Sequence, residues 1–287
     1  MKNNRLDIYV AKTLDISRNQ ALKMIKAGEV LVNGEINKGG YLLKEDDEVK
    51  IDHEEESTNL IPEKMPLDIV HEDDDIIVIN KENGVVVHPA PGNIGGTLVN
   101  GLLYHSTLSD KDPFRPGIVH RIDAYTTGLI VIAKNNKAHE FLAQQITNKK
   151  VKRKYLALVW GVIPNDTGLI DAPIGRSPND RKKMAINAKG KEAVTHFKVL
   201  ERFKNATLLE LELETGRTHQ IRVHLNYIGH PVVNDPTYGR KKLLDDSGQC
   251  LHAKELEFIH PVTKKQINFN AELPNEFIKI MNYLKGE

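Results

Sequence analysis

Cysteine is nearly absent from this chain, since Cys250 is the only one among 287 residues. A single cysteine excludes an intramolecular disulfide, and this composition suits a reducing compartment. We therefore expect a cytoplasmic location.

Long apolar runs are also missing. No uninterrupted apolar stretch approaches the roughly 18 residues that a bilayer-spanning helix needs. The first residues, MKNNRLDIYV, lack the apolar segment of a signal peptide, so we expect none. The hydrophobic fraction of 40% and the charged fraction of 28% are typical of a soluble globular protein, with enough length for about two domains.

The chain has no overall excess of one charge. Its formal net charge is +1, which argues against a basic coat that would bind nucleic acid over the whole surface. The charges are nevertheless segregated, with acidic runs at 44–57 and 71–75 and basic runs at 149–154, 181–183 and 240–242. Any one run can be ordinary solvated surface, but three basic runs after residue 145 favour a side that faces a polyanion.

The first 52 residues are predicted to form a small unit of two helices and a hairpin. Ser17 and Gln20 fit a capping box at the start of the second helix, and Gly28 ends that helix. The dipeptide Asn33-Gly34 predicts the hairpin turn. Apolar residues at helical spacing predict the first helix: Leu6, Tyr9, Val10 and Leu14.

This unit resembles the ribosomal-protein-S-four-like (αL) RNA-binding domain. Lys23 and Lys26 are expected on the outer side of the second helix, beside the hairpin. A generic helical cap domain is the alternative interpretation. The matching positions are Arg5, Leu6, Asp7, Ser17, Ala21, Ile25, Gly28, Val30, Val32, Asn33 and Gly34.

An acidic linker is expected at 53–65, followed by a larger domain at 66–287. Helices are predicted at 137–148 and 275–285, and the many strands with few helices favour an α+β fold over a regular βαβ barrel. The predicted strands are 76–80, 128–135, 155–163, 193–200 and 206–214. In the last of these, the alternating Leu209, Leu211 and Leu213 predict a half-buried strand.

The segment VHRIDAYTTGLIVIAKN (119–135) places Asp123 just before a Thr-Thr-Gly turn and a strand that is apolar throughout. A carboxylate in such a place is held rigidly, as a catalytic group must be. If it is partly buried, it needs a nearby cation to stay ionised.

A candidate for that cation lies about a hundred residues later, in LETGRTHQIRVHLNYIGHP (213–231). Gly216 and Thr218 are typical of a turn and a helix N-cap, and Gly229 and Pro231 of a helix end. Arg222 would flank the apolar face of Ile221, Leu225 and Ile228, in a polar line with His219 and Asn226. Arg222 could reach Asp123 or simply fasten the helix to the core, and the two roles are compatible.

Tyr155 follows the basic run in KRKYLALVWG and is expected at the start of a strand. An aromatic ring there could stack on a base while neighbouring cations hold phosphates. A strand-edge or core aromatic is the alternative.

Together these segments resemble the RluA/RluD-type pseudouridine synthases, with NGVVVHPAPGNIGGTLVNGLL (83–103) as a further matching block. The resemblance covers nearly the whole chain, with the motifs in the family's order. It implies a catalytic domain built on a bent, mostly antiparallel mixed β-sheet that is flanked by helices and loops. It also implies isomerisation of uridine to pseudouridine in RNA.

The resemblance implies a role for four residues. Asp123 would be the catalytic carboxylate, and Arg121 would take the space that the extruded uridine leaves. Tyr155 would stack on the uracil and help with proton handling at carbon 5, and Arg222 would pair with Asp123. No cofactor or metal is implied, which agrees with the lack of HExxH, CxxC and glycine-rich phosphate-loop motifs.

The sequence departs from the family at two positions. The family usually has an acidic residue where Tyr125 stands, and often a proline where Glu82 stands. Neither change touches the four residues above, so we expect activity, and the choice of target stays open.

Three other functions are alternatives to this one. The first is a non-catalytic RNA-binding protein, and the second is a glycoside or nucleoside hydrolase, which would need a second carboxylate. The third is a metal-dependent activity, which the scattered histidines do not favour, since His219 and His224 are five positions apart. The expected partner is RNA, large-subunit ribosomal RNA before transfer RNA, and nothing demands more than a monomer.

Overall fold

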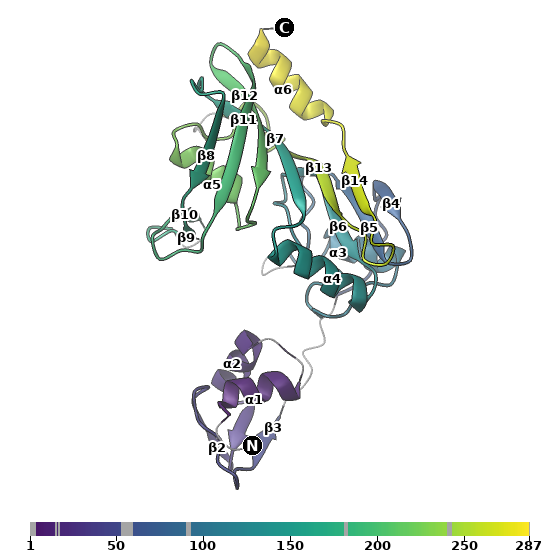
Figure 1. The fold of residues 1–287 in the computed structure, drawn as a ribbon, viewed down its shortest axis with the longest axis vertical. Coiled ribbons are helices and arrows are strands. Elements are labelled where there is room, and N and C mark those ends of the chain that lie inside the picture. The colour runs from purple at the N-terminus through teal and green to yellow at the C-terminus, as the bar shows by residue number, and fades with distance from the viewer. Residues whose placement is uncertain are drawn as a thin grey trace. The chain divides into compact units, whose positions relative to one another are not determined.

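The computed structural model describes residues 4–14, 16, 18–52, 60–89, 93–180, 183–239 and 243–286. The chain forms two compact units, residues 1–58 and residues 59–287 (Figure 1). Among the described residues, no helix combines the length and the apolar character needed to cross a membrane.

The N-terminal unit contains the two predicted helices and the predicted hairpin. Asn33 and Gly34 both have positive φ angles, 53° and 82°, as a tight two-residue hairpin turn requires. A third strand that the sequence did not predict completes the sheet, in the order β2-β1-β3. The proposed capping residue Ser17 lies outside the described residues. The elements are α1 (Leu6–Thr13), α2 (Arg18–Ala27), β1 (Val30–Val32), β2 (Glu35–Ile36) and β3 (Val49–Ile51).

A buried carboxylate explains part of the N-terminal sequence pattern. Asp7 is fully buried, and its two oxygens accept from Nε and Nη2 of Arg5, each at 3.0 Å. Arg18 Nε donates to the same carboxylate at 2.9 Å. Both arginines are half-exposed, so Asp7 fastens the chain before α1 to the start of α2.

The larger unit is built on one extensive sheet. Its elements are β4 (Ile69–Glu72), β5 (Ile76–Lys81), α3 (Leu98–His105), β6 (Thr127–Ala133), α4 (Asn136–Thr147), β7 (Lys152–Trp160), β8 (Thr167–Asp171), β9 (Ile174–Arg176), β10 (Met184–Ile186), β11 (Val194–Arg202), β12 (Ala206–Leu213), α5 (Gln220–Tyr227), β13 (Leu251–Ile259), β14 (Gln266–Asn270) and α6 (Asn275–Lys285).

The strands of this sheet follow the order β4-β5-β6-β13-β7-β12-β11-β8, and β14 pairs with β13. Only β6 and β13 pair in parallel among the described strands, so the sheet is mixed and mostly antiparallel, as predicted. Figure 1 shows β7 and β13 in the middle, with β8, β11 and β12 on one side and β4, β5 and β6 on the other. The α+β fold is therefore confirmed.

Helices cover both faces of the sheet because its inner strands are apolar on both sides. Along β5, for example, Ile77 and Ile79 share a buried cluster with α3, whereas Ile76 and Val78 share another with α4. Successive strand residues point to opposite faces, which explains the division. Helix α5 joins the α3 cluster through Ile221 and Leu225.

The sequence predicted the positions of the main strands and helices. The helices at 137–148 and 275–285 correspond to α4 and α6, and all five predicted strands are present. One boundary was wrong, because β7 begins at Lys152 and Tyr155 lies inside the strand rather than at its start. Strands β13 and β14 were not predicted, although β13 lies at the centre of the sheet.

Candidate active site

A pocket lies between the turn before β6, the start of β7 and the segment that leads into α5. All four residues that the resemblance singled out line it, namely Arg121, Asp123, Tyr155 and Arg222. The other lining residues are Ile122, Thr126, Arg153, Leu213, Gly216, Arg217, Thr218, His219, Gln220, Ile221 and Leu251.

The turn that carries Asp123 is held in place by Lys81. This lysine is 2% exposed, and its ammonium donates to the carbonyl oxygens of Glu82, Val85 and Ala124 at 2.7, 2.9 and 2.7 Å. Burial lowers the pKa of Lys81 to about 7, although the charge of Asp123 opposes this shift. Because Ala124 follows Asp123 directly, the bond to its carbonyl oxygen fixes the backbone next to the carboxylate.

The strand after this turn approaches its neighbour unusually closely at Gly128. The φ angle of Gly128 is +101°, and a Cβ atom there would lie 2.3 Å from the carbonyl oxygen of Ala253. Only glycine combines this backbone conformation with such an approach. The start of β6 therefore packs closely against β13, and the turn that carries Asp123 is rigidly supported.

Arg222 lies between two carboxylates. Its Nη1 donates to Oδ2 of Asp123 at 2.9 Å, while Nε and Nη2 donate to the two oxygens of Asp235 at 2.7 and 2.8 Å. Burial opposes the charged form of Arg222, but the hydrogen bonds and charges of Asp235 and Asp123 raise its pKa. Arg222 therefore both fastens α5 and reaches Asp123, so the two roles that the sequence left open occur together.

Asp235 was not identified from the sequence. Its side chain is fully buried, and it also accepts from the backbone N–H groups of Thr237 and Tyr238. Burial alone would raise the pKa of Asp235, but the bond to Arg222 and these backbone donors lower it. The only signal in the sequence is the position of this aspartate in a turn-forming Asn-Asp-Pro stretch, which by itself indicates no role.

Helix α5 begins differently from the prediction. Its N-cap is His219, in the left-handed conformation with a φ of 56° and without a side-chain cap, and not Thr218. Asn226, expected in line with His219 and Arg222, is exposed and does not line the pocket. Arg222 itself is buried in the helix interface rather than at its flank.

The unusual N-cap aims the ring of His219 at the carboxylate. The hydroxyl oxygen of Tyr238 accepts from the N–H of Met184 at 2.9 Å and lies 2.9 Å from Nδ1 of His219. The hydroxyl and Nδ1 form a hydrogen bond whose donor is set by the tautomer of the ring, and the other ring nitrogen is Nε2. That Nε2 lies 3.9 Å from Oδ1 of Asp123. Burial lowers the pKa of His219 despite the opposing charge of Asp123.

Tyr155 lies on the face of β7 that lines the pocket. The residue is 6% exposed, and burial raises the pKa of its phenol. Arg121 is exposed and lines the same pocket. The structure thus brings together all four residues at one place.

The charged runs have mixed outcomes. In the run 149–154, Lys149, Lys152 and Lys154 all pair with glutamates. The run 240–242 and two residues of 181–183 lie outside the described residues. The acidic run 71–75 is not free surface either, since Glu72 binds His105 and Lys134.

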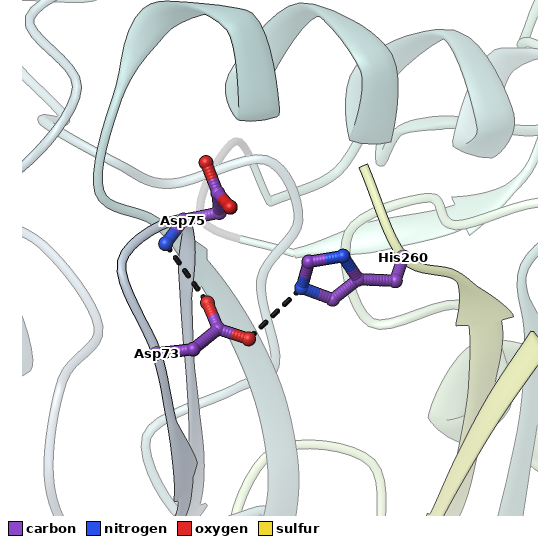
Figure 2. A group of neighbouring side chains, drawn as sticks. All are labelled: Asp73, Asp75 and His260. Atoms are coloured by element: carbon purple, nitrogen blue, oxygen red, sulfur yellow. Dashed lines mark hydrogen bonds and ion pairs between the residues drawn. The ribbon is translucent and has the colours of Figure 1, made fainter. Parts of the chain in front are cut away.

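Asp73, Asp75 and His260 lie close enough to consider a metal site (Figure 2), with one ligand atom from each within 4.8 Å of the others. Their atoms are already engaged. Asp73 accepts from the backbone of Asp75 and Ile76 and from Nε2 of His260. Nδ1 of His260 accepts from two backbone N–H groups, so this ring has no lone pair left for a metal. The cluster instead ties the β4–β5 turn to the segment after β13.

Comparisons with known proteins identify the family of this chain. Residues 75–227 match the RNA pseudouridylate synthase family, and residues 4–49 match the S4 domain family. The chain belongs to the RNA pseudouridylate synthase family and carries an N-terminal S4 domain. The resemblance found in the sequence motifs is thereby confirmed.

Relatives match over almost the entire chain. The uncharacterized RNA pseudouridine synthase YlyB of Bacillus subtilis is 50% identical, over 99% of this chain and 95% of its own. Ribosomal large subunit pseudouridine synthase D of Neisseria meningitidis serogroup B is 43% identical, over 100% and 80%. Among solved structures, human RNA pseudouridylate synthase domain containing 1 is 26% identical with a TM-score of 0.60, over 77% and 96%.

The chain is therefore an RNA pseudouridine synthase, an isomerase that converts uridine in RNA to pseudouridine without a cofactor. Substrate and product contain the same atoms, so no co-reactant is required.

Proposed function

We propose that this enzyme modifies uridines in large-subunit ribosomal RNA and that Asp123 is its catalytic carboxylate. The proposal is supported by one observation above all, the 2.9 Å contact between Asp123 and Arg222 inside a pocket that Tyr155 also lines. The ribosomal target is supported by relatives that are named large subunit pseudouridine synthase D and by the S4 domain.

The chemistry assigns one task to each pocket residue. The bond between N1 of uracil and C1′ of ribose breaks, and a bond between C5 and C1′ forms. The hydrogen of C5 leaves, and N1 gains a hydrogen, so the atoms balance. Asp123 takes part in the bond exchange, Arg222 holds it by a charge-assisted hydrogen bond, and Tyr155 stacks on the uracil while it turns.

The target uridine must leave its helix or loop to reach the pocket. Base flipping costs a few kcal/mol, and contacts elsewhere on the RNA offset this cost. Arg121, which is exposed beside the pocket, is suited to fill the space that the base leaves.

The parts of the chain divide this work. In our proposal, residues 1–52 bind RNA, residues 53–65 form an acidic linker, and residues 66–287 carry out the isomerisation. We further propose that the enzyme acts in the cytoplasm as a monomer, without a metal or an obligate protein partner.

Two alternatives make different predictions. A hydrolase of the usual two-carboxylate type needs a second free carboxylate near the first, but Asp123 is the one carboxylate among the described residues that line the pocket. Asp235, the carboxylate on the other side of Arg222, is fully buried, and both of its oxygens accept from Arg222. A pure RNA-binding protein would not need the polar network around Asp123.

The test is a turnover experiment with unmodified rRNA. The wild-type chain is incubated with transcripts of large-subunit rRNA and of transfer RNAs, and pseudouridine is mapped by chemical labelling and mass spectrometry. We expect pseudouridine in the large-subunit transcript at unchanged RNA mass, and none with Asp123→Asn, which still binds RNA. Release of free uracil would indicate a hydrolase, and modification of transfer RNA alone would overturn the ribosomal target.

A further inference from the structure

Three successive cations on β7 have different environments. Lys152 lies 2.8 Å from Glu257, and Lys154 lies within 4 Å of both Glu210 and Glu255. Arg153 between them points to the opposite face of the strand, because side chains alternate. That face carries Tyr155 and lines the catalytic pocket.

Arg153 is buried without a counter-charge. The residue is 6% exposed, and within the described parts of the chain no carboxylate forms an ion pair with it. Its Nε is buried and has no hydrogen-bond partner. A buried charge without a partner is strongly unfavourable, so such groups are expected only where a ligand completes the site.

The other arginines of the pocket either use their donors in hydrogen bonds or are exposed to solvent. Arg222 uses its donors on Asp235 and Asp123, and Arg217 Nε donates to the carbonyl oxygen of Glu192. Arg121 is exposed. Arg153 therefore has unused donors at a buried position, two residues from the ring proposed to stack on uracil.

We propose that Arg153 binds a backbone phosphate of the target RNA next to the flipped uridine. This inference rests on the proposed function and names a phosphate subsite of the same pocket. Phosphate is the group of the substrate that carries a formal charge, whereas the uracil carbonyls are neutral, and a guanidinium binds phosphate through two parallel N–H donors. Asp123 is the only acid that lines this pocket in the described residues, so the pocket suits an anion.

Gly216 provides the space that this arginine occupies. A Cβ atom at Gly216 would lie 2.8 Å from Nη1 of Arg153, closer than real side chains approach. The backbone of Gly216 is not in the left-handed region, so alanine is compatible with its conformation. The variant Gly216→Ala therefore displaces the guanidinium without removing its charge.

The experiment measures RNA affinity against salt. An unmodified large-subunit rRNA transcript is bound by the full chain carrying Asp123→Asn, which prevents turnover, with and without Arg153→Met. Loss of one phosphate contact weakens binding about tenfold and reduces the slope of log affinity against log salt by about 0.7–0.9. Lys154→Met is the matched control, and we expect it to leave the slope unchanged.

The readouts separate a phosphate contact from other roles. Arg153→Met should keep the melting temperature at or above that of the parent, because it removes an unpaired buried charge. An unchanged salt slope would overturn the proposal. This holds whether Arg153→Met in the otherwise wild-type chain lowers kcat, as a contact to uracil would, or lowers the melting temperature, as a structural role would.

A double-variant cycle adds a second test. Gly216→Ala should weaken RNA binding, and the combination with Arg153→Met should be no weaker than Arg153→Met alone. Full additivity of the two effects would contradict the proposal. These binding results do not depend on turnover, so failure of the wild-type chain to form pseudouridine would reject the proposed function separately.

Discussion

Nη1 of Arg222 lies 2.9 Å from Oδ2 of Asp123, although the two residues are 99 positions apart in the chain. The contact joins the turn before β6 to the first turn of α5. The same guanidinium is held on its other side by Asp235, so its position does not depend on Asp123 alone. This arrangement separates the positioning of Arg222 from the chemistry of Asp123.

Substitution of Asp235 tests that separation. Asp235→Asn should lower kcat by tenfold or more with little change in KM, because Arg222 loses a charged partner while the pocket keeps its lining. Arg222→Ala should destabilise the chain by about 3–5 kcal/mol, since it leaves a buried carboxylate unpaired. Single-turnover pseudouridine formation and urea unfolding measure the two effects. A wild-type kcat for Asp235→Asn would show that Asp235 has no positioning role.

The hydroxyl of Tyr238 should matter for activity through His219. Tyr238→Phe removes the hydroxyl that forms a hydrogen bond with Nδ1 of His219 and accepts from the Met184 N–H. A lost hydrogen bond of about 1–1.5 kcal/mol corresponds to a rate reduced roughly tenfold. His219→Gln should reduce the rate as much, and the double variant no further. Rates that multiply in the double variant would mean that the two residues act independently.

Lys81 should control both stability and the position of Asp123. Lys81→Met leaves three carbonyl acceptors without their donor, and at about 1 kcal/mol for each bond the free energy of unfolding should fall by about 3 kcal/mol. The rate at saturating RNA should fall as well, since Ala124 is one of the three acceptors. Urea unfolding and turnover measure both, with Lys154→Met as the control. A variant with normal stability and rate would contradict this role.

Stability should decrease on the acid side because His252 is buried in its neutral form. Burial lowers its pKa to about 4, and the ring contacts Thr127 Oγ1. The unfolded chain takes up the proton near pH ~6.5, so stability is lost as pH falls from ~6.5 to ~4, by about 3 kcal/mol from this group. Urea unfolding at pH 7.5 and 4.5 should show a smaller decrease for His252→Gln than for the wild type. An equal decrease in His252→Gln and in the wild type would contradict this role of His252.

The sequence predicted those parts of the site that depend on local pattern. Asp123 and the apolar strand after it are contiguous in the chain, so the sequence predicted that the carboxylate precedes a buried strand. The spacing of Ile221 and Leu225 predicted which face of α5 packs against the sheet. Asp235 was missed because its role arises from a long-range contact with Arg222. The position of Arg153 was missed because β7 begins earlier than expected, and only the strand's alternation turns this residue into the pocket.

The fold was predictable to a similar extent. Strands with uniform apolar character, such as β6, were evident, whereas β13 interrupts its apolar residues with Lys254, Glu255 and Glu257. Helix α3 was missed because it is short and contains Gly101, although Thr97 and Asn100 cap it reciprocally. A Thr-x-x-Asn signal before an apolar run would have indicated it.

The order of strands in the sheet affects when the enzyme can fold during translation. β6 and β7 are consecutive in the chain, but β13 is inserted between them, and it arrives nearly a hundred residues after β7. A nascent chain that ends before residue 251 has an open slot at the centre of its sheet and lacks the strand against which Gly128 presses. Catalytic competence therefore begins only when almost the entire polypeptide has left the ribosome.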